Sequence, residues 1–112
     1  MIDDARLKAL ELASEAKKAV NEALSSVDPA ESKELNEMRA CLAEIEEDLQ
    51  VTVLDRHIAE VQAYQHRLLE IDSRLDKRAV KVKEASRKVE NAAKAIGIAA
   101  EVASKVATPP LP

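Results

Sequence analysis

Apolar residues recur at helical spacing from the start of the chain. Between Ile2 and Val27 there is no glycine or proline, and apolar positions fall three or four residues apart. Charged residues lie mostly off this stripe, so one helix face is apolar and the remainder is polar. The stripe comprises Ala5, Ala9, Leu12, Ala16, Ala19, Ala23 and Val27, widened by Leu10, Val20 and Leu24. This pattern predicts an amphipathic helix over about residues 3–27.

A short polar segment separates this helix from a second one. Asp28 is suited to cap a helix N-terminus, and Pro29 fits the first helical position, where its missing N–H is harmless. Glu31 stands where a capping box places its acidic residue. The sequence therefore predicts a second helix that begins at Pro29. Because the connection is short, the two helices are expected to be antiparallel neighbours.

A long apolar seam follows Pro29, with no further glycine or proline before Gly97. Its spacing alternates between three and four residues, as in coiled coils, except for a five-residue step from Leu49 to Leu54. Such a break is absorbed by a local change of winding or marks a turn. We expect the seam to contact a partner through Leu35, Met38, Leu42, Ile45, Leu49, Leu54, Ile58, Val61, Leu68, Ile71, Leu75, Val82, Val89 and Ile96.

Two weak capping boxes are alternative sites for a turn within the seam. They are Thr52 with Asp55 and Ser73 with Asp76. Neither follows a glycine that would end the preceding helix. If neither is a turn, the helix that begins at Pro29 would be about 115 Å long at 1.5 Å per residue. A helix of that length would require self-association, because one short helix cannot cover it.

The composition favours extended helices over a globular core built on aromatic residues. Tyr64 is the only aromatic residue, Gly97 is the only glycine, and 34% of the residues are charged. Such a chain buries aliphatic side chains and alanine along seams. We therefore predict an all-α fold, an antiparallel helical bundle or elongated coiled coil of two or three long helices. Its single helical domain spans residues 1–107, and residues 108–112 form a Pro-rich tail.

Acidic and basic residues are segregated along the chain. Acids outnumber bases over residues 31–55, and bases outnumber acids over residues 74–94. An acidic and a basic helix favour each other beside an apolar seam. We expect these blocks to pair antiparallel, either within one chain or between two copies of an unbroken helix that cross near Ala63. Two independently solvated faces are the simpler alternative, because surface ion pairs contribute little.

No residue pattern points to catalysis or to a bound metal. His57 and His66 are the only histidines, and Glu60 and Glu70 follow them within one helical turn. Di-iron bundles need Glu-x-x-His on two helices, and zinc needs more His or Cys than this chain offers. Cys41 has no basic sequence neighbour that would lower the pKa of its thiol, so we expect it to be a packing residue. We predict a non-enzymatic protein with no catalytic, cofactor-binding or metal-binding residues.

The charge and the cysteine content limit which cellular compartment and which partners we expect. The net charge of −4 disfavours nucleic acid, the lone cysteine is typical of the reducing cytoplasm, and the acidic start is unlike a secretory signal. We expect a cytoplasmic interaction, adaptor or assembly module that binds another protein or forms a homodimer. The alternative is a membrane- or surface-active protein that uses the Ala-rich helix of residues 92–107. The Pro-rich tail has the form of a polyproline ligand, but its shortness favours a simple terminus.

Overall fold

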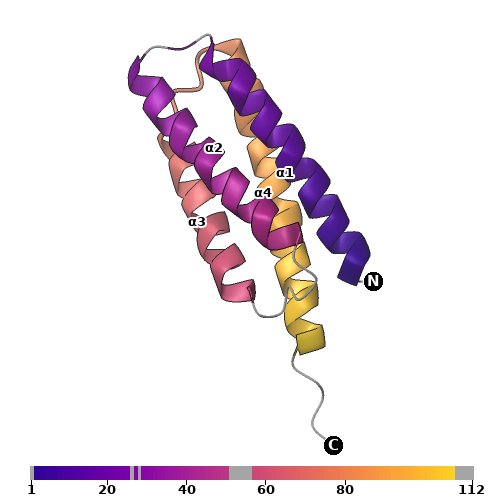
Figure 1. Ribbon diagram of the computed structural model, residues 1–112. Coiled ribbons are helices and arrows are strands. Elements are labelled where there is room, and N and C mark those ends of the chain that lie inside the picture. The colour runs from indigo at the N-terminus through magenta and orange to yellow at the C-terminus, as the bar shows by residue number, and fades with distance from the viewer. Residues whose placement is uncertain (1, 26, 28, 51–56, 108–112) are drawn as a thin grey trace, which may run out of the picture.

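The protein folds as an all-α, antiparallel four-helix bundle. The computed structural model describes residues 2–25, 27, 29–50 and 57–107. Its helices are α1 (Ile2–Leu24), α2 (Pro29–Gln50), α3 (Ile58–Arg74) and α4 (Val80–Ala107). Each helix reverses the direction of the one before it, and α4 returns to pack beside α1 (Figure 1). The helical bundle predicted from the sequence is confirmed, but the described residues form four helices and not two or three.

The first connection lies where the sequence places it. α2 begins at Pro29, as predicted. α1 ends at Leu24, three residues before the predicted end, because Ser25 turns back onto the helix. Both the backbone N–H and the hydroxyl of Ser25 donate to the Glu22 carbonyl, at 3.4 and 2.7 Å. The expected capping roles of the Asp28 and Glu31 side chains, like the Pro-rich tail, lie outside the described residues.

The stretch that follows Pro29 is divided twice, so the single unbroken helix is wrong. α2 ends at Gln50 and α3 begins at Ile58, on either side of the five-residue step in the seam. A second division separates α3 from α4 at residues 75–79. The two alternative turn sites are therefore both places where the chain reverses (Figure 1). Two reversals allow one chain to cover its own seam, which removes the reason to expect two copies crossing at Ala63.

The second reversal does not use the capping box proposed for it. Ser73 lies in the last turn of α3, where its hydroxyl donates to the Glu70 carbonyl at 2.6 Å. Asp76 instead accepts hydrogen bonds from the backbone N–H and the guanidinium of Arg78, at 3.2 and 2.6 Å. These contacts hold the pKa of Asp76 below its usual range. The turn is thus closed by a side chain that binds backbone two residues further on. Thr52 and Asp55, the other proposed box, lie outside the described residues.

The predicted seam forms the interior of the bundle. Every seam residue that the structure describes is buried except Ile58, which is half-buried. Leu54 lies outside the described residues. α1 and α4 share the most extensive contact between any two helices, and their buried faces consist largely of alanine. Small side chains at the contact allow two helix backbones to approach closely. The alanines buried on α1 and α4 therefore allow the first and last helices to pack closely.

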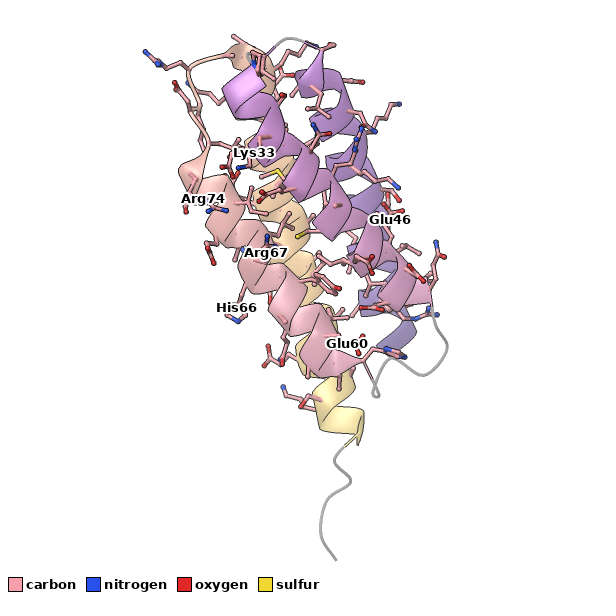
Figure 2. All side chains as sticks on the ribbon, turned by 60° about the vertical axis from the view of Figure 1, so that its left-hand side comes forward. Lys33, Glu46, Glu60, His66, Arg67 and Arg74 are labelled. Atoms are coloured by element: carbon pink, nitrogen blue, oxygen red, sulfur yellow. The ribbon has the colours of Figure 1, made fainter. Side chains whose placement is uncertain are left out.

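The acidic block pairs with α3 and not with the basic helix α4. α2 packs between α1 and α3, which leaves α4 at the diagonally opposite corner. Arg74 at the end of α3 lies 3.5 Å from Glu34 and 3.8 Å from Glu37. Arg67 lies two helical turns before Arg74 on the same side of α3 (Figure 2). Its guanidinium is 3.8 Å from the Glu37 carboxylate. Of the basic block, Arg74 therefore does pair antiparallel with the acidic block, but the part of the block on α4 does not lie beside α2, because bundle topology decides which helices touch.

Candidate functional site

The end of α2 and the start of α3 bring three potential metal ligands together. His57 immediately precedes α3, and its Nδ1 atom lies 3.4 Å from Glu60 Oε2 and 4.0 Å from Asp48 Oδ1. One donor atom from each of the three side chains lies within 4.8 Å of the other two. The sequence paired His57 with Glu60 but missed Asp48. Asp48 joins them only because the chain reverses between α2 and α3.

Asp48 stands in an electrostatically unfavourable place. Its side chain is only 13% exposed, and burial together with the nearby Glu60 carboxylate raises its pKa. Glu46 and Glu47 share the same last turn of α2, where the helix dipole is negative and further acids are disfavoured. Lys17 of α1 compensates Glu46 at 2.9 Å. Among the residues that the structure describes, the His57 ring at 4.0 Å is the one group within ion-pair distance of Asp48 that can carry a positive charge.

His66 differs from His57 in every respect that matters for ligand binding. It is exposed in the middle of α3, and its side chain points away from the bundle (Figure 2). Glu70, its expected neighbour on the same face, is exposed as well. No ion pair joins the two side chains in the described part of the protein. His66 is therefore a solvated histidine on the outer face of α3.

Cys41 is buried between α2 and α3, at the floor of a shallow groove of about 200 Å³. Burial raises the pKa of its thiol, and this effect outweighs the opposing influence of Arg67. Arg67 comes from α3, so the sequence around Cys41 gave no sign of it. A buried thiol that holds its proton is a poor nucleophile, because the thiolate is the reactive form.

A buried serine–aspartate pair joins α3 to α4. Ser86 is 1% exposed and its hydroxyl donates to Asp72 Oδ1 at 2.7 Å, while Lys77 Nζ donates to Asp72 Oδ2 at 3.3 Å. Nucleophilic catalysis needs a base that takes the serine proton and space for a substrate. Here the carboxylate is held by a lysine, and the hydroxyl is closed off from solvent. The arrangement ties two helices together, and the sequence did not reveal it because its members lie on different helices.

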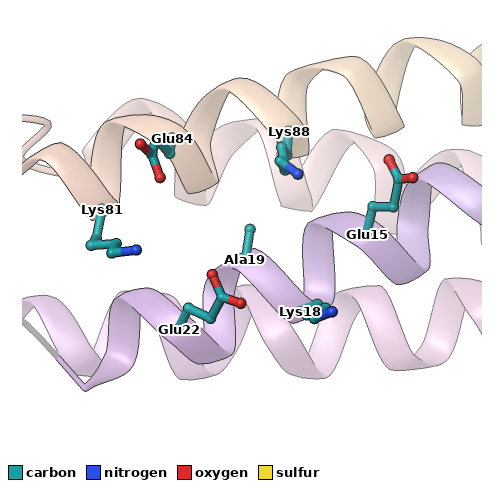
Figure 3. A pocket seen from close by; sticks show the side chains of 7 residues that line it. All are labelled: Glu15, Lys18, Ala19, Glu22, Lys81, Glu84 and Lys88. Atoms are coloured by element: carbon teal, nitrogen blue, oxygen red, sulfur yellow. The ribbon is translucent and has the colours of Figure 1, made fainter.

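A polar groove of about 310 Å³ runs between α1 and α4 (Figure 3). Ala19 forms part of its floor, and acids and bases from both helices project around it. Because the acids and bases are equal in number, no net charge gathers in the groove. The lining residues are Glu15, Lys18, Ala19 and Glu22 of α1 and Lys81, Glu84 and Lys88 of α4.

The outer surface of α4 carries three cations that form no ion pair within the part of the chain that the structure describes. We call this surface the basic face and define it by Lys83, Arg87 and Lys94. All three are exposed, whereas Lys81 and Lys88 lie on the flank of α4 toward α1, where they line the polar groove. Val80 lies at the start of the row and is 71% exposed. With Lys83, Glu84 and Arg87 it borders a shallow depression of about 220 Å³.

Neither a membrane-spanning helix nor similarity to a known protein assigns a function to the clusters and grooves described above. Across the described residues, no helix combines the length and the apolar character that crossing a bilayer requires. Comparisons with models of protein families, with curated proteins and with solved structures gave no significant match. The structure therefore defines the class of the protein, an all-α four-helix bundle, and the surface features must support any functional proposal.

Proposed function

We propose that the protein is a non-enzymatic helical interaction module, an adaptor or assembly element that binds another protein through the basic face of α4. The observation that carries this proposal is the row of three exposed cations, Lys83, Arg87 and Lys94, which pair with no described carboxylate and lie beside the exposed Val80. Exposed apolar side chains and unpaired cations on one helix face offer a partner both contact area and electrostatic attraction.

The apolar seam supports the fold and is not free in this structure. Leu42, Leu68 and Val89 are all fully buried in the bundle. A partner that bound the seam directly would have to separate helices and expose these side chains to water. The loss for each large core residue would be about 2–3 kcal/mol. An exposed face therefore offers the less costly site for the protein–protein interaction expected from the sequence.

An acidic helix of another protein is the partner that fits the basic face best. Val80, Lys83 and Arg87 follow the three-and-four spacing that places residues on one helix face. The protein itself shows this mode of pairing, since Arg67 and Arg74 of α3 lie along the glutamates of α2. The acids of α2 are partly engaged within the chain, which favours a different protein over a second copy.

The alternative, a membrane-surface role for the Ala-rich C-terminal helix, has less support. α4 buries Ala92, Ile96 and Ala99 against the rest of the bundle, so its apolar face is already covered. Beyond Lys94, the described part of α4 has one exposed large apolar residue, Ile98, which is 50% exposed. Insertion into a lipid surface needs a broad uncovered apolar face.

Charge reversal tests the proposal. The double variant Lys83→Glu, Arg87→Glu reverses the centre of the basic face, and Lys33→Glu, Arg39→Glu makes the same change in net charge on α2, away from α4. Proteins captured from source cells by the wild type and by the control variant, but not by the first, are purified and titrated individually. We expect binding to weaken at least about tenfold in the first variant and to weaken as salt rises.

Equal affinity of both variants for every purified partner would contradict the proposal. Co-sedimentation with anionic phosphatidylserine vesicles distinguishes the alternative. If the wild type binds vesicles and the Lys83→Glu, Arg87→Glu variant does not, the basic face serves a membrane surface and the protein-partner proposal fails.

A further inference from the structure

The first support for a second site is the geometry of the Asp48–His57–Glu60 cluster. Tetrahedral zinc sites have ligand bonds of about 2.0–2.2 Å, which places neighbouring donor atoms about 3.3–3.6 Å apart. The distance of 3.4 Å between His57 Nδ1 and Glu60 Oε2 falls in this range. The distance of 4.0 Å to Asp48 Oδ1 exceeds it by a few tenths of an ångström. All three donor atoms lie within 4.8 Å of one another, so side-chain rotations that shorten the longer separations would bring them to one ion.

The second support is a buried oxygen atom whose bonding capacity is unused. Asp48 Oδ2 is inaccessible to solvent and has no hydrogen-bond partner among the described residues. Buried carboxylate oxygens without a partner are costly, because the lost hydration is not replaced. This atom also lies in the last turn of α2, beside Glu46 and Glu47, at the negative end of the helix dipole. A cation bound by the Asp48 carboxylate would offset the negative charge gathered at this end of α2.

The mixture of donors indicates which cation fits. One imidazole nitrogen and two carboxylate oxygens suit zinc and similar divalent transition metals, whereas magnesium and calcium prefer oxygen ligands alone. Asp48 is a largely buried anchor, while Glu60, with a side chain 62% exposed, leaves a route of entry from solvent. Three protein ligands leave at least one position for water.

We propose that Asp48, His57 and Glu60 bind a zinc ion that ties the end of α2 to the start of α3. This site is independent of the interaction proposed for the basic face, which lies on α4. An ion bound only by the folded protein stabilises it by mass action. Because the ligands come from both sides of the reversal between α2 and α3, zinc would link the adjoining ends of these two helices.

The test is isothermal titration of the full chain with ZnCl₂ in a non-chelating buffer, together with thermal unfolding with and without zinc. The two histidines provide a matched pair of variants, since His57→Gln removes a ligand and His66→Gln removes an exposed histidine of the same helix. We expect one zinc per chain in the wild type and in His66→Gln. His57→Gln should bind at least about tenfold more weakly, since even loss of an outer-shell partner costs 10–100-fold.

Zinc should also raise the melting temperature of the wild type and of His66→Gln but not of His57→Gln. Asp48→Asn keeps the shape of the side chain, so it guards against a failure to fold, and it should weaken zinc binding as well. Cobalt(II) bound in place of zinc should give the visible absorption of a tetrahedral site, and magnesium should not compete. No binding by the wild type, equal binding by His57→Gln, or one zinc shared between two chains would overturn the proposal.

Discussion

Leu68 and Lys83 lie in opposite environments, one on the apolar face of its helix and the other on the polar face. Leu68 is fully buried on α3, inside the seam shared by the four helices. Lys83 is exposed on α4 and forms no ion pair with the described carboxylates. Closely packed interiors respond to the loss of a few methyl groups, whereas exposed and unpaired charges contribute little to stability.

We therefore expect Leu68→Ala to lower the free energy of unfolding by about 2–4 kcal/mol, through lost burial and the cavity left behind. Lys83→Ala should change it by well under about 1 kcal/mol. Urea unfolding followed by circular dichroism measures both values. Similar losses in the two variants would mean that Leu68 is not part of the core.

The ionisation of the Cys41 thiol is coupled to folding because the thiol is buried in the native bundle. Burial raises its pKa above the ordinary value of 9.0, so the folded protein holds the thiol proton more tightly than the unfolded chain does. The corresponding stability is present below the thiol pKa of the unfolded chain and is lost as the pH rises through the folded value.

Two measurements check this coupling. As the pH rises above about 8.5, where the thiol of an unfolded chain ionises, the wild type should lose stability faster than Cys41→Ala, which has no thiol to ionise. At pH 8, iodoacetamide should alkylate the native protein at least about tenfold more slowly than the urea-unfolded chain, because reaction requires local opening. Parallel pH profiles of the two proteins would contradict the assigned burial.

At the scale of elements, Gly97 of α4 lies against the Gln65 side chain of α3. It lies within α4 with an ordinary helical backbone, since no described glycine has a positive φ. A Cβ atom added there would come within 2.6 Å of the Gln65 side-chain nitrogen, which donates to the Ala93 carbonyl at 2.8 Å. The glycine therefore leaves room for a hydrogen bond between the two helices.

Gly97→Ala combines two opposing effects. The helix gains about 1 kcal/mol in propensity, and displacement of the Gln65 amide loses about 0.5–1.5 kcal/mol. In the wild-type background we expect little net change in the free energy of unfolding. In a Gln65→Ala background the same substitution should stabilise the protein by about 1 kcal/mol. A double-mutant cycle measures the difference, and equal effects in both backgrounds would show that Gln65 does not respond to position 97.

At the scale of the whole molecule, the order of the helices separates charge and covers the seam. α2 is rich in acids and α4 in bases, and the bundle places them at opposite corners. The bundle measures 56 × 20 × 18 Å, far shorter than one unbroken helix from Pro29. Each chain covers its own apolar residues, so the seam gives no reason for two copies to associate.

We expect light scattering to give the mass of one chain and small-angle X-ray scattering to give a radius of gyration near the 14.6 Å of the Cα trace. The melting temperature should not depend on protein concentration, because no dissociation accompanies unfolding. A mass of two chains, with a melting temperature that rises with concentration, would instead support the self-association expected from a long helix.

The features that the sequence determined are those that depend on near neighbours along the chain. Helical periodicity compares each residue with those three and four positions away, so it predicted the helical fold and most of the seam residues that the bundle buries, although not the number of helices. The start of α2 at Pro29 was equally clear, because proline is favoured at the first helical position by its own ring geometry.

Only the tertiary structure decided which distant residues meet. The reversals after Gln50 and Arg74 lack the glycine that marks a helix end, so sequence signals could not choose between one turn, two turns or none. Asp48 approaches His57 only because the first of these reversals occurs, and Arg67 reaches Cys41 for the same reason. Local propensity limits which elements form, whereas the contacts between elements follow from how four amphipathic helices bury their apolar faces together.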